Sequence, residues 1–307
     1  MSVEYAIIVK NKTRLESLIE RFNTKAQAKF YIERLGGNFE DYEVEHETFQ
    51  YSLNALQTQL SRVIKHKTLE RVYMPSFIFS PNQLIIVIGQ DGLVANTAKY
   101  SRGIPIVAVN PDKHRYDGVL LPFDTSDFIG GVESVMSGRY SSKTMRFAEA
   151  LLNDGQRLLA FNDLFIGAST HISARYKISF NNKAEEHSSS GLIVSTQAGS
   201  TGWLSSVFNM AYGVTGLFEK NLKAKRPKLG ESELLFAVRE PFQSIRTQTG
   251  IVAGVIKNKG KLVIESLMPV SGVIFSDGIE SDFLKFTSGS IATIGIAKET
   301  ATIVTRD

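Results

Sequence analysis

The first half of the chain alternates short apolar runs with stretches in which apolar residues recur about every 3.6 positions. The runs of strand length are Tyr5–Val9, Leu84–Ile88 and Ile104–Val109, and the helix-compatible stretches are 15–22, 53–63 and 94–100. The second run, a glycine turn, a helix and the third run follow one another directly. This succession predicts a right-handed βαβ unit with parallel, buried strands.

Past about residue 160 the apolar period changes from 3.6 to 2. Tyr176, Ile178 and Phe180 alternate with polar residues before an Asn181-Asn182 turn, which is typical of a hairpin. Further runs of strand length are Gly191–Thr196, Leu234–Val238, Leu262–Ile264, Val273–Phe275 and Ile291–Ile296, with an Asp277-Gly278 turn among them. One helix is expected near Trp203–Tyr212. The second half is therefore predicted to be rich in β-strands.

Two domains are expected from this change of period. The first, residues 1–140, is an α/β domain with a parallel sheet, and the second, residues 141–307, is a β-rich, sandwich-like domain. The boundary lies within 124–150, where Asp124-Thr-Ser-Asp127 and Gly130-Gly131 interrupt the pattern. A length of 307 residues accommodates both domains.

Composition excludes several classes of protein. The chain has 0 cysteines, which rules out disulfides, cysteine-ligated metal and a thiol nucleophile. The net charge is +4 without a nucleic-acid-binding motif, and the basic cluster between Lys220 and Lys228 is expected to be a solvated loop, so no nucleic-acid partner is predicted. The longest apolar run, Leu84–Gly89, is too short for a membrane span. Met1–Lys10 shows no export or transit signal, and a cytoplasmic location is expected.

The first candidate site is the turn Gly89-Gln-Asp-Gly92, which follows a buried strand and precedes a helix. Open α/β sheets bind ligands at this edge, and the backbone N–H groups of such a turn can face phosphate oxygens. Asp91 could accept a proton from a hydroxyl nucleophile or coordinate Mg²⁺. The alternative is that Asp-Gly is a common turn dipeptide without a chemical role.

Two further polar segments flank apolar strands in the second half. Gly199-Ser-Thr-Gly202 leads into the expected helix and offers hydroxyls and backbone donors, although a flexible hairpin loop explains the same composition. Asn162-Asp163 precedes the apolar run Leu164–Ile166 and by itself is most simply a turn. The five histidines lack zinc-binding spacing, and no resident metal site is predicted. The P-loop and dinucleotide fingerprints GxxxxGK[ST] and GxGxxG are both absent.

Taken in order, the three segments resemble the signature blocks of the ATP-dependent NAD kinases. Gly-Gln-Asp-Gly-Leu is similar to GGDGT, Asn-Asp to the NE block, and Gly191–Trp203 to the GLIVSTPTGSTAY-type block. The mitochondrial-type branch of the family is the more similar, through Val109–Lys113 running on to Gly118–Pro122, Ser189–Leu192, the tryptophan at 203 and Leu235–Pro241. The resemblance extends from about residue 5 to Val304.

The resemblance implies a two-domain NAD kinase-like architecture with the active site between the domains. It makes residues 1–140, which carry the Gly-Gln-Asp-Gly turn, a nucleotide-binding domain and residues 141–307 an NAD-binding domain. In the family reaction the γ-phosphoryl group of ATP, with Mg²⁺, is transferred to the adenosine 2′-hydroxyl of NAD⁺. By similarity Asp91 is the general base, and Gly89 and Gly92 approach the phosphates. The residues implied to bind the dinucleotide are Asn162, Asp163, Ser190, Gly199, Ser200, Thr201, Gly202 and Trp203. A homodimer or larger homo-oligomer is also implied.

Two positions depart from the first block, since Gln90 replaces its second glycine and Leu93 its threonine. A positive φ at Gln90 would be strained, and Leu93 removes a hydroxyl donor. Three functions therefore stay open: an active NAD kinase, a non-catalytic NAD- or nucleotide-binding protein of the same fold, and a sugar or lipid kinase of the same superfamily, which also uses a Gly-Asp-Gly turn.

Overall fold

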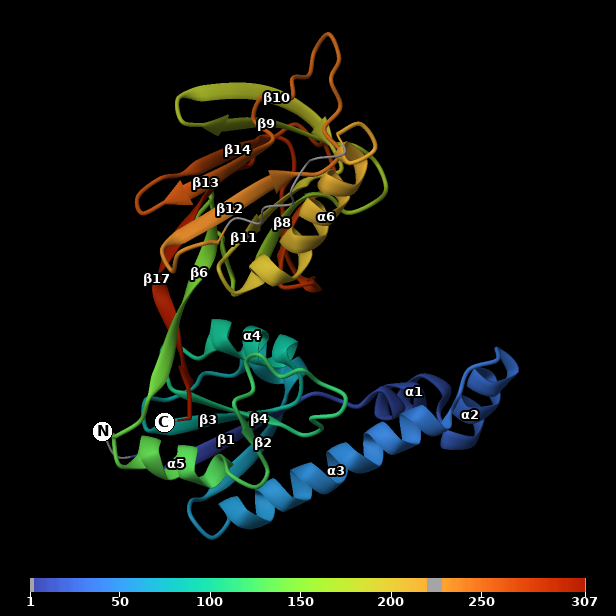
Figure 1. The fold of residues 1–307 in the computed structure, drawn as a ribbon, viewed down its shortest axis with the longest axis vertical. Coiled ribbons are helices and arrows are strands. Elements are labelled where there is room, and N and C mark those ends of the chain that lie inside the picture. The colour runs from blue at the N-terminus through green and yellow to red at the C-terminus, as the bar shows by residue number, and fades with distance from the viewer. Residues whose placement is uncertain (1–2, 220–227, 307) are drawn as a thin grey trace. The chain divides into compact units, whose positions relative to one another are not determined.

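The computed structural model describes residues 3–219 and 228–306, which form two compact units (Figure 1). The first unit is Met1–Thr144 together with Ala301–Asp307, and the second is Met145–Thr300. The sequence predicted one boundary after residue 140, whereas the end of the chain returns to the first unit and Ile303 pairs there with Ile106. A strand-forming run does not specify which sheet it joins. Of the predicted solvated loop at 220–228, only Lys228 lies within the described residues.

The first unit contains a parallel sheet with strands in the order β2-β1-β3-β4-β5. Its strands are β1 (Tyr5–Lys10), β2 (His66–Glu70), β3 (Gln83–Ile88), β4 (Ile106–Asn110) and β5 (Phe123–Asp124). Its helices are α1 (Arg14–Phe22), α2 (Lys25–Arg34), α3 (Glu40–Leu60), η1 (Arg71–Ser76), α4 (Asp91–Tyr100) and α5 (Phe128–Met136). The pairing of β3 with β4 across α4 confirms the predicted βαβ unit.

Helices cover both faces of this sheet, which is why its central strands are apolar at successive positions. On one face Leu53 and Leu56 of α3 and Val132 of α5 pack against Ile86 and Val107. Helix α4 lies on the opposite face, as Figure 1 shows. Leu84–Ile88 in β3 are all buried, so this strand and the turn that follows it are firmly placed.

The second unit consists of two mainly antiparallel sheets. One has the order β10-β9-β14-β17, with β6 paired to β17 and β7 paired to β6, and the other has the order β13-β12-β11-β8-β15-β16. Its strands are β6 (Ser142–Leu152), β7 (Arg157–Ala160), β8 (Asp163–Ala168), β9 (Ala174–Phe180), β10 (Lys183–Ser189), β11 (Leu192–Ser195), β12 (Glu233–Val238), β13 (Ala253–Lys257), β14 (Leu262–Ser266), β15 (Gly272–Ser276), β16 (Ile279–Lys285) and β17 (Ile291–Val304). Its helices are η2 (Gly199–Thr201) and α6 (Trp203–Thr215). The predicted fold class, α/β followed by β-rich, is confirmed.

The six-stranded sheet of the second unit is apolar on both faces. Leu164 and Ile166 of β8 point into the core that it shares with the other sheet. Phe165 points to the outer face, where it clusters with Ile193 and with Leu204 of α6. Because side chains alternate along a strand, Asp163 is on the same outer face as Phe165, with about 7 Å between their positions along β8. The outer face is therefore the one that carries the candidate site.

The hairpin that joins β9 and β10 has the predicted turn, with φ of 50° at Asn181 and 62° at Asn182. Two central residues with positive φ define a type I′ turn, in which glycine is favoured at the second position. We expect Asn182→Gly to raise the free energy of unfolding by about 0.5 kcal/mol. Urea denaturation monitored by circular dichroism checks this value. A destabilised Asn182→Gly protein would contradict it, and Asn181→Val, which forces a β-branched residue to positive φ, is the opposite control.

Within 3–219 and 228–306, no helix is long and apolar enough to cross a membrane.

Candidate functional site

The turn between β3 and α4 presents its polar residues at the carboxyl end of a buried strand. Gly89 is buried and Gln90 is exposed, and Gln90 precedes the first residue of α4, Asp91. Gln90 has φ −100° and ψ 163°, an extended conformation that any residue adopts. The replacement of a glycine by Gln90 therefore imposes no backbone strain.

The Leu93 side chain packs into the space that a side chain at position 89 would occupy. The Leu93 side chain is buried, and its Cδ2 lies 3.0 Å from the position that a Cβ on Gly89 would occupy. A larger residue at 89 would have to displace Leu93. The Leu93 carbonyl accepts a hydrogen bond from Thr97 Oγ1 at 2.7 Å, so the first turn of α4 is held from within. Leu93 thus has a packing role in place of the hydroxyl that it lacks.

The Asp91 carboxylate is oriented by the loop that follows β4. Asp91 Oδ1 accepts a hydrogen bond from the backbone N–H of Leu120 at 2.6 Å. Asn110 Nδ2 donates to the carbonyl of Tyr116 at 3.0 Å and lies 2.7 Å from where a Cβ on Gly118, with φ +66°, would be. One loop therefore contains both segments, Val109–Lys113 and Gly118–Pro122, on its two sides. The contacts between these sides fix the backbone that orients the Asp91 carboxylate.

No side chain caps the N-terminus of α4, although Asp91 stands in its first turn. The first N–H groups of a helix have no partner within the helix, and together with the helix dipole they favour an anion. The turn from Gly89 to Gly92 thus combines anion-binding backbone donors with one oriented carboxylate.

In the second unit, Asn162 and Asp163 form a corner between β7 and β8. Residues 196–199 pack closely against this corner. Thr196 N donates to the Asn162 carbonyl at 2.9 Å, and Thr196 Oγ1 donates to the Phe161 carbonyl at 2.5 Å. Thr196 Oγ1 also accepts the N–H of Gly199 at 3.3 Å. A Cβ on Gly199 would lie 2.4 Å from the Asn162 carbonyl oxygen, so only glycine fits there.

Asp163 is the titratable group that this corner buries. Its side chain is 9% exposed, and its Oδ1 has no hydrogen-bond partner among the described residues. Burial raises the pKa of the Asp163 carboxyl to about 7; a hydrogen bond from Ser195 opposes this shift and the nearby charge of Asp277 adds to it. A buried carboxyl with a raised pKa and an oxygen without a partner marks a candidate functional site.

This burial makes folding stability depend on pH. The folded pKa of Asp163 is raised above the ordinary 3.8, so between about pH 4 and 7 the folded protein holds a proton that the unfolded chain has released. Stability is therefore expected to fall by about 1 kcal/mol per pH unit as pH rises through that window, and to level off above it. Asp163→Asn removes this contribution. Urea denaturation of both proteins between pH 4.5 and 8 checks the difference, and identical pH dependences would contradict it.

Asp277 contacts the Asn162–Asp163 corner, although the sequence indicated it only as part of a turn. With φ of 55° at Asp277 and 71° at Gly278, it does form the predicted β15–β16 turn. Its carboxylate also accepts N–H groups from the Asn162–Asp163 corner, 115 residues earlier in the chain. No local pattern indicates such a contact, because it depends on how the strands are ordered in the sheet.

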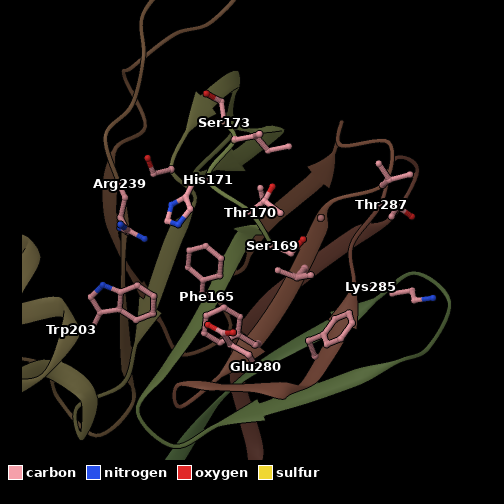
Figure 2. A pocket seen from close by; sticks show the side chains of 18 residues that line it. Phe165, Ser169, Thr170, His171, Ser173, Trp203, Arg239, Glu280, Lys285 and Thr287 are labelled. Atoms are coloured by element: carbon pink, nitrogen blue, oxygen red, sulfur yellow. The ribbon is translucent and has the colours of Figure 1, made fainter. Parts of the chain in front are cut away.

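Trp203, the first residue of α6, borders an open pocket of about 1020 Å³ on the outer face of the six-stranded sheet (Figure 2). Its ring stacks on Phe165 with centroids 5.6 Å apart and an interplanar angle of 9°. Phe165 stacks in turn on Phe275 at 4.8 Å, and Arg239 lies 5.4 Å above the Trp203 ring. Ser190 lines the same pocket. Sequence reasoning missed Phe165, Phe275 and Arg239, although strand alternation from Asp163 would have indicated the first.

The remaining residues of the third block have mixed roles. Ser200 Oγ donates to the Gln197 carbonyl at 2.7 Å, and Thr201 and Gly202 are exposed ahead of α6. The structure thus brings Asn162, Asp163 and Gly199 into one corner, and Ser190 and Trp203 into one pocket, all in the second unit. The residues Gly89, Asp91 and Gly92 belong to the first unit and form the separate turn described above.

The part of the chain that the structure describes contains no group of three or more His, Asp or Glu residues that could hold a metal ion. Mg²⁺ in phosphoryl-transfer sites is usually bound by one or two carboxylates and by the phosphates of the substrate. The single carboxylate of Asp91 fits a metal that arrives on a triphosphate better than a resident one.

Comparison with known proteins finds sequence similarity over part of the chain. No protein-family model matches the chain. A stretch of 128 residues, 39% of the chain, is 32% identical to an NAD kinase of Heliobacterium modesticaldum and covers 44% of it. A stretch of 125 residues is 29% identical to an NAD kinase of Chlorobium limicola and covers 42% of it. The matches thus span less than half the length of these relatives.

Solved structures extend the similarity over the whole chain. A yeast NADH kinase complexed with NADH matches with a TM-score of 0.60 and 15% identity, covering 100% of this chain and 85% of the kinase. An NAD kinase from Archaeoglobus fulgidus in complex with ATP matches with a TM-score of 0.56 and 15% identity, covering 98% of this chain and 92% of the kinase. The chain therefore has the fold of the NAD kinases.

Proposed function

We propose that the protein is an NAD kinase, which transfers the γ-phosphoryl group of ATP to the adenosine 2′-hydroxyl of NAD⁺ to give NADP⁺. The observation that carries the proposal is the Asn162–Asp163 corner. Gly199 packs closely against it, and the buried Asp163 carboxyl has an Oδ1 without a partner among the described residues. The second and third sequence blocks meet in this corner. The similarity to NAD kinases and the fold support the same function.

On the phosphoryl-donor side, the turn at the head of α4 supplies the required groups. Backbone N–H groups at the uncapped helix terminus bind phosphate oxygens, and Gly92 leaves open space beside them, since a Cβ there would contact nothing within 4 Å. Asp91 accepts the proton of the attacking hydroxyl, because its carboxylate is held by Leu120 N–H. Phosphoryl transfer needs mainly positioning and charge neutralisation, and these groups provide both. Magnesium bound to ATP would supply further charge neutralisation.

On the acceptor side, Asn162 and Asp163 bind the ribose hydroxyls of NAD⁺. Asp163 is on the same face of β8 as Phe165, so a dinucleotide whose ribose contacts Asp163 extends along the strand into the aromatic pocket. The Phe165–Trp203 stack offers a flat apolar floor for a ring, and Ser190 and Arg239 supply polar groups at its edge. This pocket is the part of the site that accommodates the second nucleoside.

The finer features of the proposal rest on the sequence and on the resemblance. These are membership of the mitochondrial-type branch, a homodimer or larger homo-oligomer, the magnesium requirement and the cytoplasmic location.

The experiment that tests the proposal is NADP⁺ formation by the purified protein from NAD⁺, ATP and Mg²⁺, measured through an NADP-specific dehydrogenase. Product formation supports the kinase. Calorimetric binding of NAD⁺ without product would instead indicate a nucleotide-binding protein, the alternative that Leu93 favours because it removes a hydroxyl from the first block. Failure to bind NAD⁺ would redirect the search to sugar and lipid acceptors.

A further inference from the structure

The Asp277 carboxylate accepts hydrogen bonds from three consecutive backbone N–H groups. Asp277 Oδ1 accepts from Asn162 N at 2.6 Å and from Asp163 N at 3.3 Å, and its Oδ2 accepts from Phe161 N at 3.1 Å. The N–H of Asp277 itself donates to the Asp163 carbonyl at 2.9 Å. Four hydrogen bonds thus attach the β15–β16 turn to the corner in front of β8.

The corner needs this partner because its backbone turns between two strands. Buried backbone N–H groups are costly unless they are hydrogen-bonded, and a carboxylate satisfies several at once. The geometry also suits the residue type, since Asp277 has φ 55° and aspartate is among the few residues that tolerate this region. Asn162 and Asp163 are therefore held in position by a side chain in the turn of the neighbouring β15–β16 hairpin.

The same contact places two carboxyl groups side by side. Asp163 is the more buried of the two, and burial is the main cause of its raised pKa, with the charge of Asp277 adding to it. Asp277 carries the negative charge that the three N–H groups stabilise. The two carboxyl groups therefore differ in their contacts: that of Asp277 accepts three backbone N–H groups, and that of Asp163 has an Oδ1 without a partner among the described residues.

We infer that Asp277 is a positioning residue for the phosphoryl acceptor, and that it fixes the Asn162–Asp163 corner in the orientation that binds the ribose hydroxyls. The inference rests on the proposed function, because it assigns the ribose to that corner. Asp277 acts through the corner, and it is distinct from the residues that the signature blocks indicate.

Asp277→Asn is the discriminating variant. It keeps the size and backbone preference of the residue and one carbonyl acceptor, but it removes the charge and the second acceptor oxygen. We expect the KM for NAD⁺ to rise about ten-fold or more while the KM for ATP changes less than about two-fold. The pKa of the Asp163 carboxyl, followed by carbon-13 NMR of labelled aspartate and assigned with Asp163→Asn, should fall. A purely structural role would lower the melting temperature and leave these readouts unchanged.

Asp154→Asn is the matched control. Asp154 Oδ1 also accepts a backbone N–H, from Gln156 at 3.0 Å, but in an exposed turn between β6 and β7. Its substitution should alter neither KM nor the Asp163 pKa. An Asp277→Asn protein with wild-type KM for NAD⁺ and an unchanged Asp163 pKa would overturn the inference.

The inference and the proposed function fail in different ways. If the wild-type protein binds NAD⁺ without phosphorylating it, the kinase proposal fails, and a weaker calorimetric affinity of Asp277→Asn for NAD⁺ still supports the positioning role. Wild-type kinase activity combined with an insensitive Asp277→Asn variant leaves the function intact and overturns the inference. A wild-type protein that neither binds nor phosphorylates NAD⁺ overturns both.

Discussion

Asp91→Asn is expected to lower kcat for NADP⁺ formation by about 10³-fold, within the range that general bases contribute. An asparagine cannot accept the proton of the 2′-hydroxyl at neutral pH. It can still accept the 2.6 Å hydrogen bond from Leu120 N–H through its carbonyl oxygen, so the loop after β4 keeps its place. The melting temperature should therefore change little, and the loss should be confined to turnover.

The measurement is kcat in the NADP-specific coupled assay, together with thermal unfolding. Asp127→Asn is a suitable control, since Asp127 Oδ1 also accepts a backbone N–H, from Asp124 at 2.8 Å, in the same unit. That variant should keep turnover within a few-fold of the wild type. An Asp91→Asn protein that retains more than about a tenth of the wild-type kcat would mean that another group takes the proton.

Gly199→Ala is expected to damage both stability and acceptor binding. The added Cβ would lie 2.4 Å from the Asn162 carbonyl oxygen and 2.8 Å from Asp163 Oδ1. The first contact is with backbone that is itself hydrogen-bonded to Thr196, so the corner cannot yield without losing that bond. We expect the free energy of unfolding to fall by about 1–3 kcal/mol. The affinity for NAD⁺ should fall roughly a hundred-fold, because the ribose-binding groups are displaced.

Urea denaturation and calorimetry with NAD⁺ check the two effects separately. Gly213→Ala is the control, because a Cβ there contacts nothing within 4 Å in the interior of α6. Alanine is favoured over glycine in a helix by about 1 kcal/mol, so this variant should be stabilised. Unchanged NAD⁺ affinity in Gly199→Ala would show that the close approach of this loop does not shape the site.

The fold was predictable where local periodicity determines it. The fully apolar run at Leu84–Ile88 indicated a buried strand. The alternation of apolar and polar residues at Tyr176–Phe180 indicated a hairpin strand, and both strands are confirmed. The return of the chain to the first unit through Ile303 was not predictable, since pairing with β4 depends on a strand almost 200 residues earlier in the sequence. A strand pattern specifies an element, whereas its partner is determined by the packing of the whole unit.

Some residues of the candidate site could likewise be indicated by local sequence, and others only by the structure. The residues of the signature blocks were found from local sequence, and the structure places Asn162, Asp163 and Gly199 in contact. Gln90 shows the limit of this approach, because it replaces a glycine of the resembled block, and only the structure shows that φ at this position is −100° and imposes no strain. The contribution of Asp277 could not be found from the sequence, since the three N–H groups that it accepts belong to the β7–β8 corner, more than 110 residues earlier in the chain.

The hydrogen bond from Leu120 to Asp91 has a consequence for how this site can vary among relatives. The donor is a peptide N–H, so every amino acid except proline supplies it, and the side chain at position 120 is free to differ. What must be kept is the path of the loop, which depends on Asn110 and on the positive φ of Gly118. Selection on the orientation of the Asp91 carboxylate would therefore act on Asn110 and Gly118, and hardly at all on the side chain at position 120.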